Sequence, residues 1–175
     1  MQPDLDIRLK AMIKAMTEVV LPAVDSSNSA AVEQARLVTA SIALVREQVD
    51  YLHWYAATEA RELMEFGRAL VESWSGVTGA SIESAILDAM KVAARADVPT
   101  SSLTAANRAL REALSAGIAE ALGSGDPAVR ERVEHLVLER SEALLRLERS
   151  FVAPTGFEVD RQGLASIRET LDGMR

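Results

Sequence analysis

The feature that most constrains the fold is the stretch from Ser29 to Trp74, in which apolar residues recur at helical spacing. Gaps of four and three residues alternate along it and place these residues on one helix face, which we call the apolar seam: Val38, Ile42, Val45, Val49, Leu52, Ala56, Leu63, Phe66 and Leu70. No glycine or proline occurs from Ser29 to Phe66. The pattern therefore predicts one long helix, with Gly67 as the residue where it could bend.

The other segments show the same period of 3.6 residues, and none alternates with a period of two. Connections that contain glycine, proline or short polar runs separate them. We expect helices over residues 4–21, 29–74, 81–96, 102–122, 127–151 and 161–172. The predicted fold is all-α, an antiparallel helical bundle of five to six helices built on one long central helix. Residues 1–175 suit a single all-helical domain.

The length of the central helix bears on the oligomeric state. At 1.5 Å per residue, a helix over residues 29–74 is almost 70 Å long. A compact globule of this size has a diameter of roughly 40 Å. Either the helix bends, or the shorter helices dock along an elongated molecule, or part of the helix packs on a second subunit. We favour an elongated molecule that forms a homodimer.

Charge and composition argue against several classes of function. The net charge of −7 and the pI near 4.9 oppose binding to nucleic acid or to an anionic membrane surface. The chain contains no cysteine, which excludes disulfides and thiolate metal sites. The apolar stretch from Ala11 to Val24 is interrupted by Lys14, Glu18 and Pro22, so we expect neither a membrane span nor a signal peptide. We therefore expect a cytoplasmic protein without a cofactor.

Two charged residues break apolar helix faces. Glu59 fills the gap in the apolar seam between Ala56 and Leu63, and Arg140 lies in the middle of the apolar face predicted for residues 127–151. If the two helices face each other, Glu59 and Arg140 form a buried ion pair that sets their register. The alternative is a pocket in which these two residues bind a small charged ligand.

Aromatic residues cluster within the long helix. At 100° per residue, Tyr51 and Tyr55 flank the apolar seam, whereas Trp54 points almost directly away from it. Trp54 then needs a cover of its own, either another helix of the same chain or a second protein. Because tryptophan and tyrosine dominate interface anchors, Tyr51, Trp54 and Tyr55 are the candidate interface residues.

Catalytic and metal motifs are weak. His53 follows Asp50 by three residues, and His135 has Glu131 and Glu139 one turn away on either side. Di-metal bundles require two Glu-x-x-His helices with inward carboxylates, a pattern that this sequence lacks, so a carboxylate and histidine metal site is only a remote alternative. Phosphate-binding loops and nucleophile elbows are also absent from the sequence. We therefore assign no catalytic residue and lean against an enzyme.

The first third of the chain resembles a known group of proteins. The segments Glu18-Val19-Val20-Leu21-Pro22-Ala23-Val24, Ala35-Arg36-Leu37-Val38 and Ile42-Ala43-Leu44-Val45-Arg46-Glu47-Gln48 carry the resemblance. They are similar to the opening of helical bacterial proteins of unknown function, encoded near aminoglycoside-phosphotransferase-like kinases and acyl-CoA dehydrogenases. The resemblance implies an accessory protein and no specific activity. Together with the aromatic cluster, it favours a non-catalytic bundle that self-associates or binds a protein partner.

Overall fold

The computed structural model describes residues 4–153 and 163–174. Within these ranges every regular element is a helix and none is a strand, so the predicted all-α class is confirmed. The chain divides into two compact units, which we describe separately. The first comprises residues 1–51 and 151–163, and the second comprises residues 52–150 and 164–175. The prediction of a single domain stays a prediction, because units defined by internal contacts need not fold independently.

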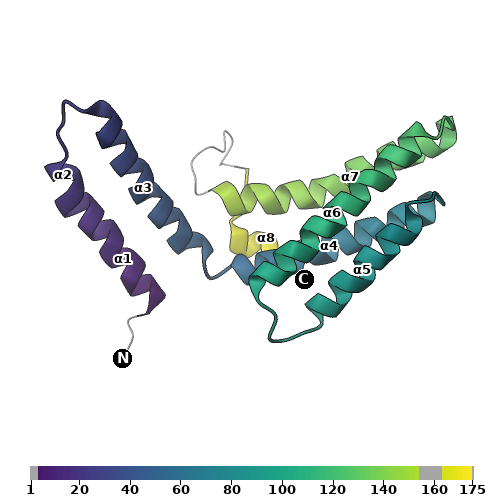
Figure 1. Cartoon of the computed structure of the whole chain (residues 1–175), viewed down its shortest axis with the longest axis horizontal. Coiled ribbons are helices and arrows are strands. Elements are labelled where there is room, and N and C mark those ends of the chain that lie inside the picture. The colour runs from purple at the N-terminus through teal and green to yellow at the C-terminus, as the bar shows by residue number, and fades with distance from the viewer. Residues whose placement is uncertain (1–3, 154–162, 175) are drawn as a thin grey trace. The chain divides into compact units, whose positions relative to one another are not determined.

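The first unit contains an α-helical hairpin, in which α1 (Leu5–Ala15) packs beside α3 (Ser29–Gln48) (Figure 1). A π-helical turn, η1 (Met16–Val20), and the short α2 (Leu21–Ala23) continue α1. The π turn ends at Val20, two residues before Pro22, which has no N–H to donate to the carbonyl four residues earlier, that of Glu18. The helix expected over residues 4–21 thus continues two residues past its predicted end, to Ala23. Asn28 begins α3, because its side chain accepts a hydrogen bond from Ala31 N at 3.1 Å.

The single long helix predicted over residues 29–74 is wrong. α3 ends at Gln48, and α4 begins at Leu52 and ends at Ser73. Between them the backbone tightens into a turn, in which Tyr51 N donates to Gln48 O at 2.9 Å. Val49, Asp50 and Tyr51 all have weak helix propensity, so this part of the chain leaves the helix without glycine or proline. The two helices span roughly 30 and 33 Å, which removes the length conflict that first suggested an elongated dimer.

The second unit is a helical bundle. α6 (Thr100–Gly123) packs on both α4 and α5 (Gly79–Ala93), and α7 (Pro127–Val152) contributes its apolar face to the same core (Figure 1). The core is aliphatic, as the composition predicts, and its innermost side chains are leucine, isoleucine and valine: Leu63, Leu70, Ile82, Leu110, Leu114 and Val133. The predicted apolar faces of α4 and α7 are therefore confirmed in this unit. The finer antiparallel arrangement stays a prediction.

Two glycines allow the helices of this bundle to approach closely. A Cβ atom added at Gly67 would lie 2.9 Å from Ile86 Cδ1, and one at Gly117 would lie 2.7 Å from Ile82 Cδ1. Both distances are shorter than a normal contact, so a larger residue at either position would force the facing isoleucine side chain to shift within the core. α4 continues through Gly67, whose role is therefore close packing.

The C-terminal helix is shorter than predicted. α8 (Ile167–Gly173) begins at Ser166, whose side chain and that of Glu169 form a capping box, in which each accepts a hydrogen bond from the other residue's backbone N–H. The predicted helix over 161–172 starts partly outside the described residues. Leu171 is fully buried and anchors the helix within the second unit.

Candidate functional site

Glu59, the predicted break in the apolar seam, lies at the centre of a buried polar network. The whole residue is only 8% exposed, which confirms that an acidic residue lies in the apolar seam. Arg111 donates to Glu59 Oε1 through Nε at 3.1 Å and Nη2 at 2.7 Å. Asn107 Nδ2 donates to Oε2 at 2.6 Å. Arg111 Nη2 also donates to Glu148 Oε1 at 2.7 Å. α6 therefore supplies the partners of the buried carboxylate.

The network fixes the protonation of its neighbours. Burial, and then the charges of Glu59 and Glu148, raise the pKa of Tyr55 to about 12. Burial lowers the pKa of Arg111, but the hydrogen bonds and charges of the same two carboxylates outweigh it and raise that pKa. Tyr55 and Arg111 thus keep their protons at neutral pH, and neither is suited to act as a general base. Glu59 and Arg111 thus form an ion pair whose carboxylate is buried and whose guanidinium is partly exposed.

Arg140 does not face Glu59. Its Nη1 lies 3.6 Å from Glu65 Oε2, and the two side chains are 34% and 46% exposed. Within the described part of the chain, Arg140 Nε is buried without a hydrogen-bond partner. The hypothetical pair of Glu59 with Arg140 is therefore wrong, because each residue has a different partner. Burial, and then the charge of Glu65, raise the pKa of Glu62, and the charges of Arg61 and Arg140 oppose this rise.

Sequence reasoning missed Asn107 and Arg111. Arg111 lies among other charged residues, Arg108 and Glu112, a pattern that predicts a solvated side chain, yet its guanidinium binds Glu59. Asn107 is 2% exposed and lies in line with the buried Leu103, Leu110 and Leu114 of α6. A polar residue in an otherwise apolar stripe is the same signal that revealed Glu59, so Asn107 was detectable from its spacing.

The predicted aromatic interface does not form one cluster within one unit. Tyr51 belongs to the first unit, whereas Trp54 and Tyr55 belong to the second. All three side chains are partly buried. Trp54 is thus not simply left in water, and its proposed role as an interface anchor stays a prediction.

The two histidines lie apart from any cluster of possible metal ligands. His53 Nδ1 is 3.5 Å from Thr100 Oγ1, and His135 Nδ1 is 4.0 Å from Glu139 Oε2 in a pair that is 82% and 60% exposed. Over residues 4–153 and 163–174, no group of three or more histidine, aspartate or glutamate side chains is placed to hold a metal ion. The nearest partners of both histidines are therefore ordinary surface contacts.

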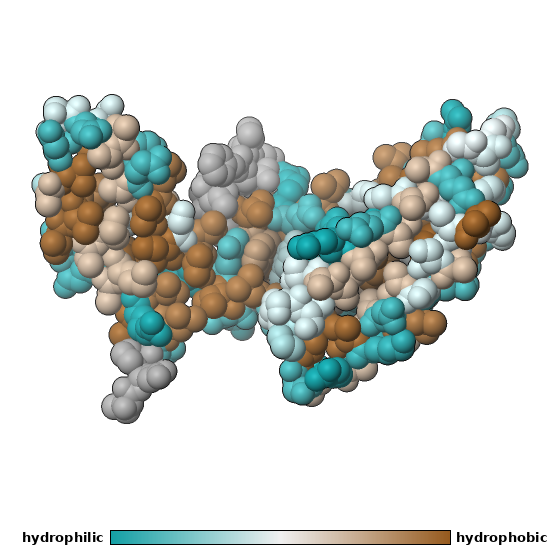
Figure 2. All heavy atoms as spheres, viewed as in Figure 1, coloured by the Kyte–Doolittle hydropathy of each residue, from teal (hydrophilic) through white to brown (hydrophobic). Residues whose placement is uncertain are grey.

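An apolar face on the α1–α3 hairpin is the most unusual surface feature. Asp6 binds Arg46 at 2.6 Å, and Leu9 and Ala35 are buried where the two helices meet. Beside this contact runs a groove of about 500 Å³. Six apolar residues, Gln34 and Ser41 line it: Leu9, Met12, Gln34, Leu37, Val38, Ser41, Ile42 and Val45. We call these eight residues the hairpin face, and Figure 2 shows apolar side chains gathered over α1 and α3.

Four residues of the hairpin face are about half exposed. Met12 is 50% exposed, Leu37 and Val38 are 47% exposed, and Val45 is 48% exposed. Val38 and Val45 of the apolar seam are therefore exposed, whereas seam residues on α4 from Ala56 onward, such as Leu63, are buried. The hairpin face adjoins the side of α3 on which Ala35 is buried, so the apolar surface of the hairpin extends beyond the contact between the two helices.

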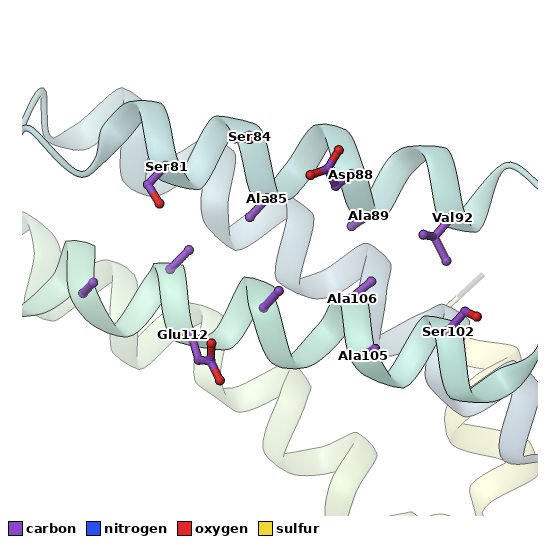
Figure 3. Close-up of a pocket in the computed structure, with 13 residues that line it drawn as sticks. Ser81, Ser84, Ala85, Asp88, Ala89, Val92, Ser102, Ala105, Ala106 and Glu112 are labelled. Atoms are coloured by element: carbon purple, nitrogen blue, oxygen red, sulfur yellow. The ribbon is translucent and has the colours of Figure 1, made fainter.

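A second groove, between α5 and α6, is lined almost entirely by small side chains (Figure 3). Its volume is about 710 Å³, and its charged lining residues are Asp88 and Glu112. Asp88 is bound to Lys91 at 2.8 Å on the same helix. Alanine and serine supply few directional contacts, so this groove shows no selective chemistry.

Comparisons with known proteins add no family. The sequence matches no family model, and no curated protein or solved structure is significantly similar to it. Among residues 4–153 and 163–174, no helix combines the length and the apolarity that crossing a bilayer requires. The resemblance of the first third to helical bacterial proteins therefore stays a prediction, and the functional argument depends on the surfaces themselves.

Proposed function

We propose that this chain is a non-catalytic interaction protein that binds another polypeptide through the hairpin face. The observation that carries the proposal is that Met12, Leu37, Val38 and Val45 remain half exposed on adjoining helices. Burying an aliphatic side chain completely stabilises a protein by about 1.5–3 kcal/mol, so covering the exposed halves of these four contributes roughly 4 kcal/mol.

The buried network supports a non-catalytic role. Glu59 is engaged by Arg111 and Asn107, and Arg140 lies against Glu65. Neither Glu59 nor Arg140 lines the hairpin face or the α5–α6 groove. The alternative of a charged ligand pocket around these two residues therefore gains no support from their geometry.

The test is a double substitution on the hairpin face, Val38→Glu with Val45→Glu. Both side chains are half exposed, so the fold should be retained, with an unchanged far-ultraviolet circular dichroism spectrum. Burying the two carboxylates against a partner is unfavourable, and we expect binding to weaken by more than about 100-fold. Val77→Glu is the matched control, because Val77 is 90% exposed and lies outside the hairpin face.

Two measurements report binding by the wild-type and variant chains. Light scattering detects self-association, and affinity capture from extracts of the source cells detects other protein partners. We expect at least one of these associations to be lost in the double variant and retained in the control. If the double variant matches the wild type in both measurements, the hairpin face is not the binding surface and the proposed function is wrong.

A further inference from the structure

We infer that Met90 is a site of oxidation by hydrogen peroxide and that Arg68 binds the resulting sulfoxide, which ties α5 to α4 more firmly. Both residues lie in the second unit, Arg68 on α4 and Met90 on α5. The inference is therefore independent of the hairpin face. It adds a site of covalent modification to a surface for which the proposed function assigns no role.

The observation behind the inference is a contact between a cation and a thioether. Arg68 Nη2 donates to Met90 Sδ at 3.4 Å. Both side chains are exposed, and Met90 is 44% exposed. A thioether sulfur is only a weak hydrogen-bond acceptor, so this contact contributes little in the reduced protein. The guanidinium nevertheless lies where it would bind a stronger acceptor on the same sulfur.

Oxidation of Met90 creates that stronger acceptor. The sulfur attacks one oxygen of hydrogen peroxide with a lone pair, the O–O bond breaks, and the departing hydroxide takes the proton of the transferred oxygen to leave as water. The sulfur loses two electrons and the peroxide gains them, so the products are methionine sulfoxide and water. A hydrogen bond from a guanidinium to the polar sulfoxide oxygen is charge-assisted. Because the Arg68 side chain is exposed, it can shift to accommodate the added oxygen without disturbing the core.

The surroundings of two other methionines show why Met90 differs. Met64 is 9% exposed and belongs to the aliphatic core, where a polar sulfoxide would be unfavourable. Met12 is 50% exposed, but its groove is lined mostly by apolar side chains. Among these three residues, all within the described part of the chain, Met90 is the one whose sulfur accepts a hydrogen bond from a cation. Oxidation at Met90 therefore gains a contact instead of losing one.

Peptide mass spectrometry after mild treatment with hydrogen peroxide locates the sulfoxide, and we expect it at Met90 before the buried Met64. Tryptophan fluorescence during heating then measures the melting temperature of the second unit, which contains both tryptophans. Met90→Leu, treated in the same way, corrects for oxidation at the other methionines. We expect the treatment to favour the wild type over Met90→Leu by about 1–3 °C, the shift expected from one exposed charge-assisted hydrogen bond in a chain of this size.

Variants of two exposed arginines separate the effect of the guanidinium from that of oxidation itself. Arg68→Leu removes the donor to Met90. Arg108→Leu is the matched control, because Arg108 is exposed on α6 of the same unit. The gain in melting temperature should disappear in Arg68→Leu and remain in Arg108→Leu. Far-ultraviolet circular dichroism checks that both variants fold.

Met90→Gln gives a second measurement that needs no peroxide, because its amide oxygen stands in for the sulfoxide oxygen. Arg68→Leu should lower the melting temperature of Met90→Gln more than it lowers that of the wild type, and an equal effect on both would overturn the inference. The inference is also wrong if Met64 is oxidised before Met90, if the treated wild type gains nothing over Met90→Leu, or if the gain persists in Arg68→Leu.

Discussion

Removing the guanidinium of Arg111 tests the assignment of Glu59 to a buried ion pair. In Arg111→Met, Glu59 Oε1 loses both of its hydrogen bonds from Arg111, while Oε2 keeps the bond from Asn107 at 2.6 Å. The Glu59 side chain is only 11% exposed, so water replaces the lost donors poorly. Breaking a fully buried pair costs about 3–5 kcal/mol. Because the Arg111 side chain is 41% exposed, we expect a smaller loss of about 2 kcal/mol.

Tryptophan fluorescence during urea unfolding suits this measurement, because both tryptophans, Trp54 and Trp74, lie in the second unit with the network. A loss of about 2 kcal/mol corresponds to a melting temperature lower by about 4–8 °C for a chain of this size. Adding Glu59→Gln to Arg111→Met should recover at least about 1 kcal/mol, because the remaining amide carries no charge to bury. Arg108→Met, at an exposed position of the same helix, should change stability by less than about 0.5 kcal/mol.

The reasoning would be refuted if Arg111→Met were as stable as Arg108→Met. It would also fail if the double variant were no more stable than Arg111→Met, since the cost would then not arise from an unpaired carboxylate. Circular dichroism of the folded variants separates either result from a general loss of helix.

Three further outcomes follow from particular contacts. Arg140→Met should change the free energy of unfolding by less than about 1 kcal/mol, which urea unfolding would measure. The loss is small because the partner of this arginine, Glu65, is partly exposed and because its buried Nε makes no hydrogen bond. Gly117→Ala should lower the free energy of unfolding by about 1–3 kcal/mol, because its new Cβ would lie 2.7 Å from Ile82 Cδ1. Gly123→Ala should not destabilise the protein, because nothing lies within 4 Å of the added Cβ. Hydrogen bonds that the hydroxyl and backbone N–H of Thr78 donate to Glu120 hold the pKa of its carboxyl below the ordinary value. Glu120→Gln should therefore lower the melting temperature at pH 7 but not once pH falls below the lowered pKa.

Sequence periodicity predicted the helical class and most of the core, because burial of an aliphatic face is the dominant local signal. It also found Glu59, since one charged residue in an apolar seam stands out. It did not find Arg111, because an arginine among other charges looks solvated until its distant partner is known. The end of α3 at Gln48 was missed for a different reason. Val49, Asp50 and Tyr51 each weaken a helix by less than about 1 kcal/mol, so surrounding packing decides whether the helix continues.

The sequence predicted that residues of the hairpin face are apolar but not that they are exposed. The spacing correctly placed Val38 and Val45 on an apolar helix face. The same spacing continues along α4, where the seam residues from Ala56 onward are buried, so spacing alone could not show that Val38 and Val45 are exposed. Periodicity reports that a face is apolar, whereas the fold determines whether the chain itself covers it. This difference separates a core from a binding surface.

The order of synthesis gives the hairpin face a further consequence. α1 and α3 are complete at Gln48, before α4 has been translated. At about 5–20 residues per second, the helices from α4 to α8 take on the order of ten seconds to make. During that time the half-exposed leucine and valine side chains of α3 are available to chaperones and to neighbouring nascent chains on the same messenger RNA. The yield of correctly assembled protein should therefore depend on how quickly this early hairpin is covered during translation.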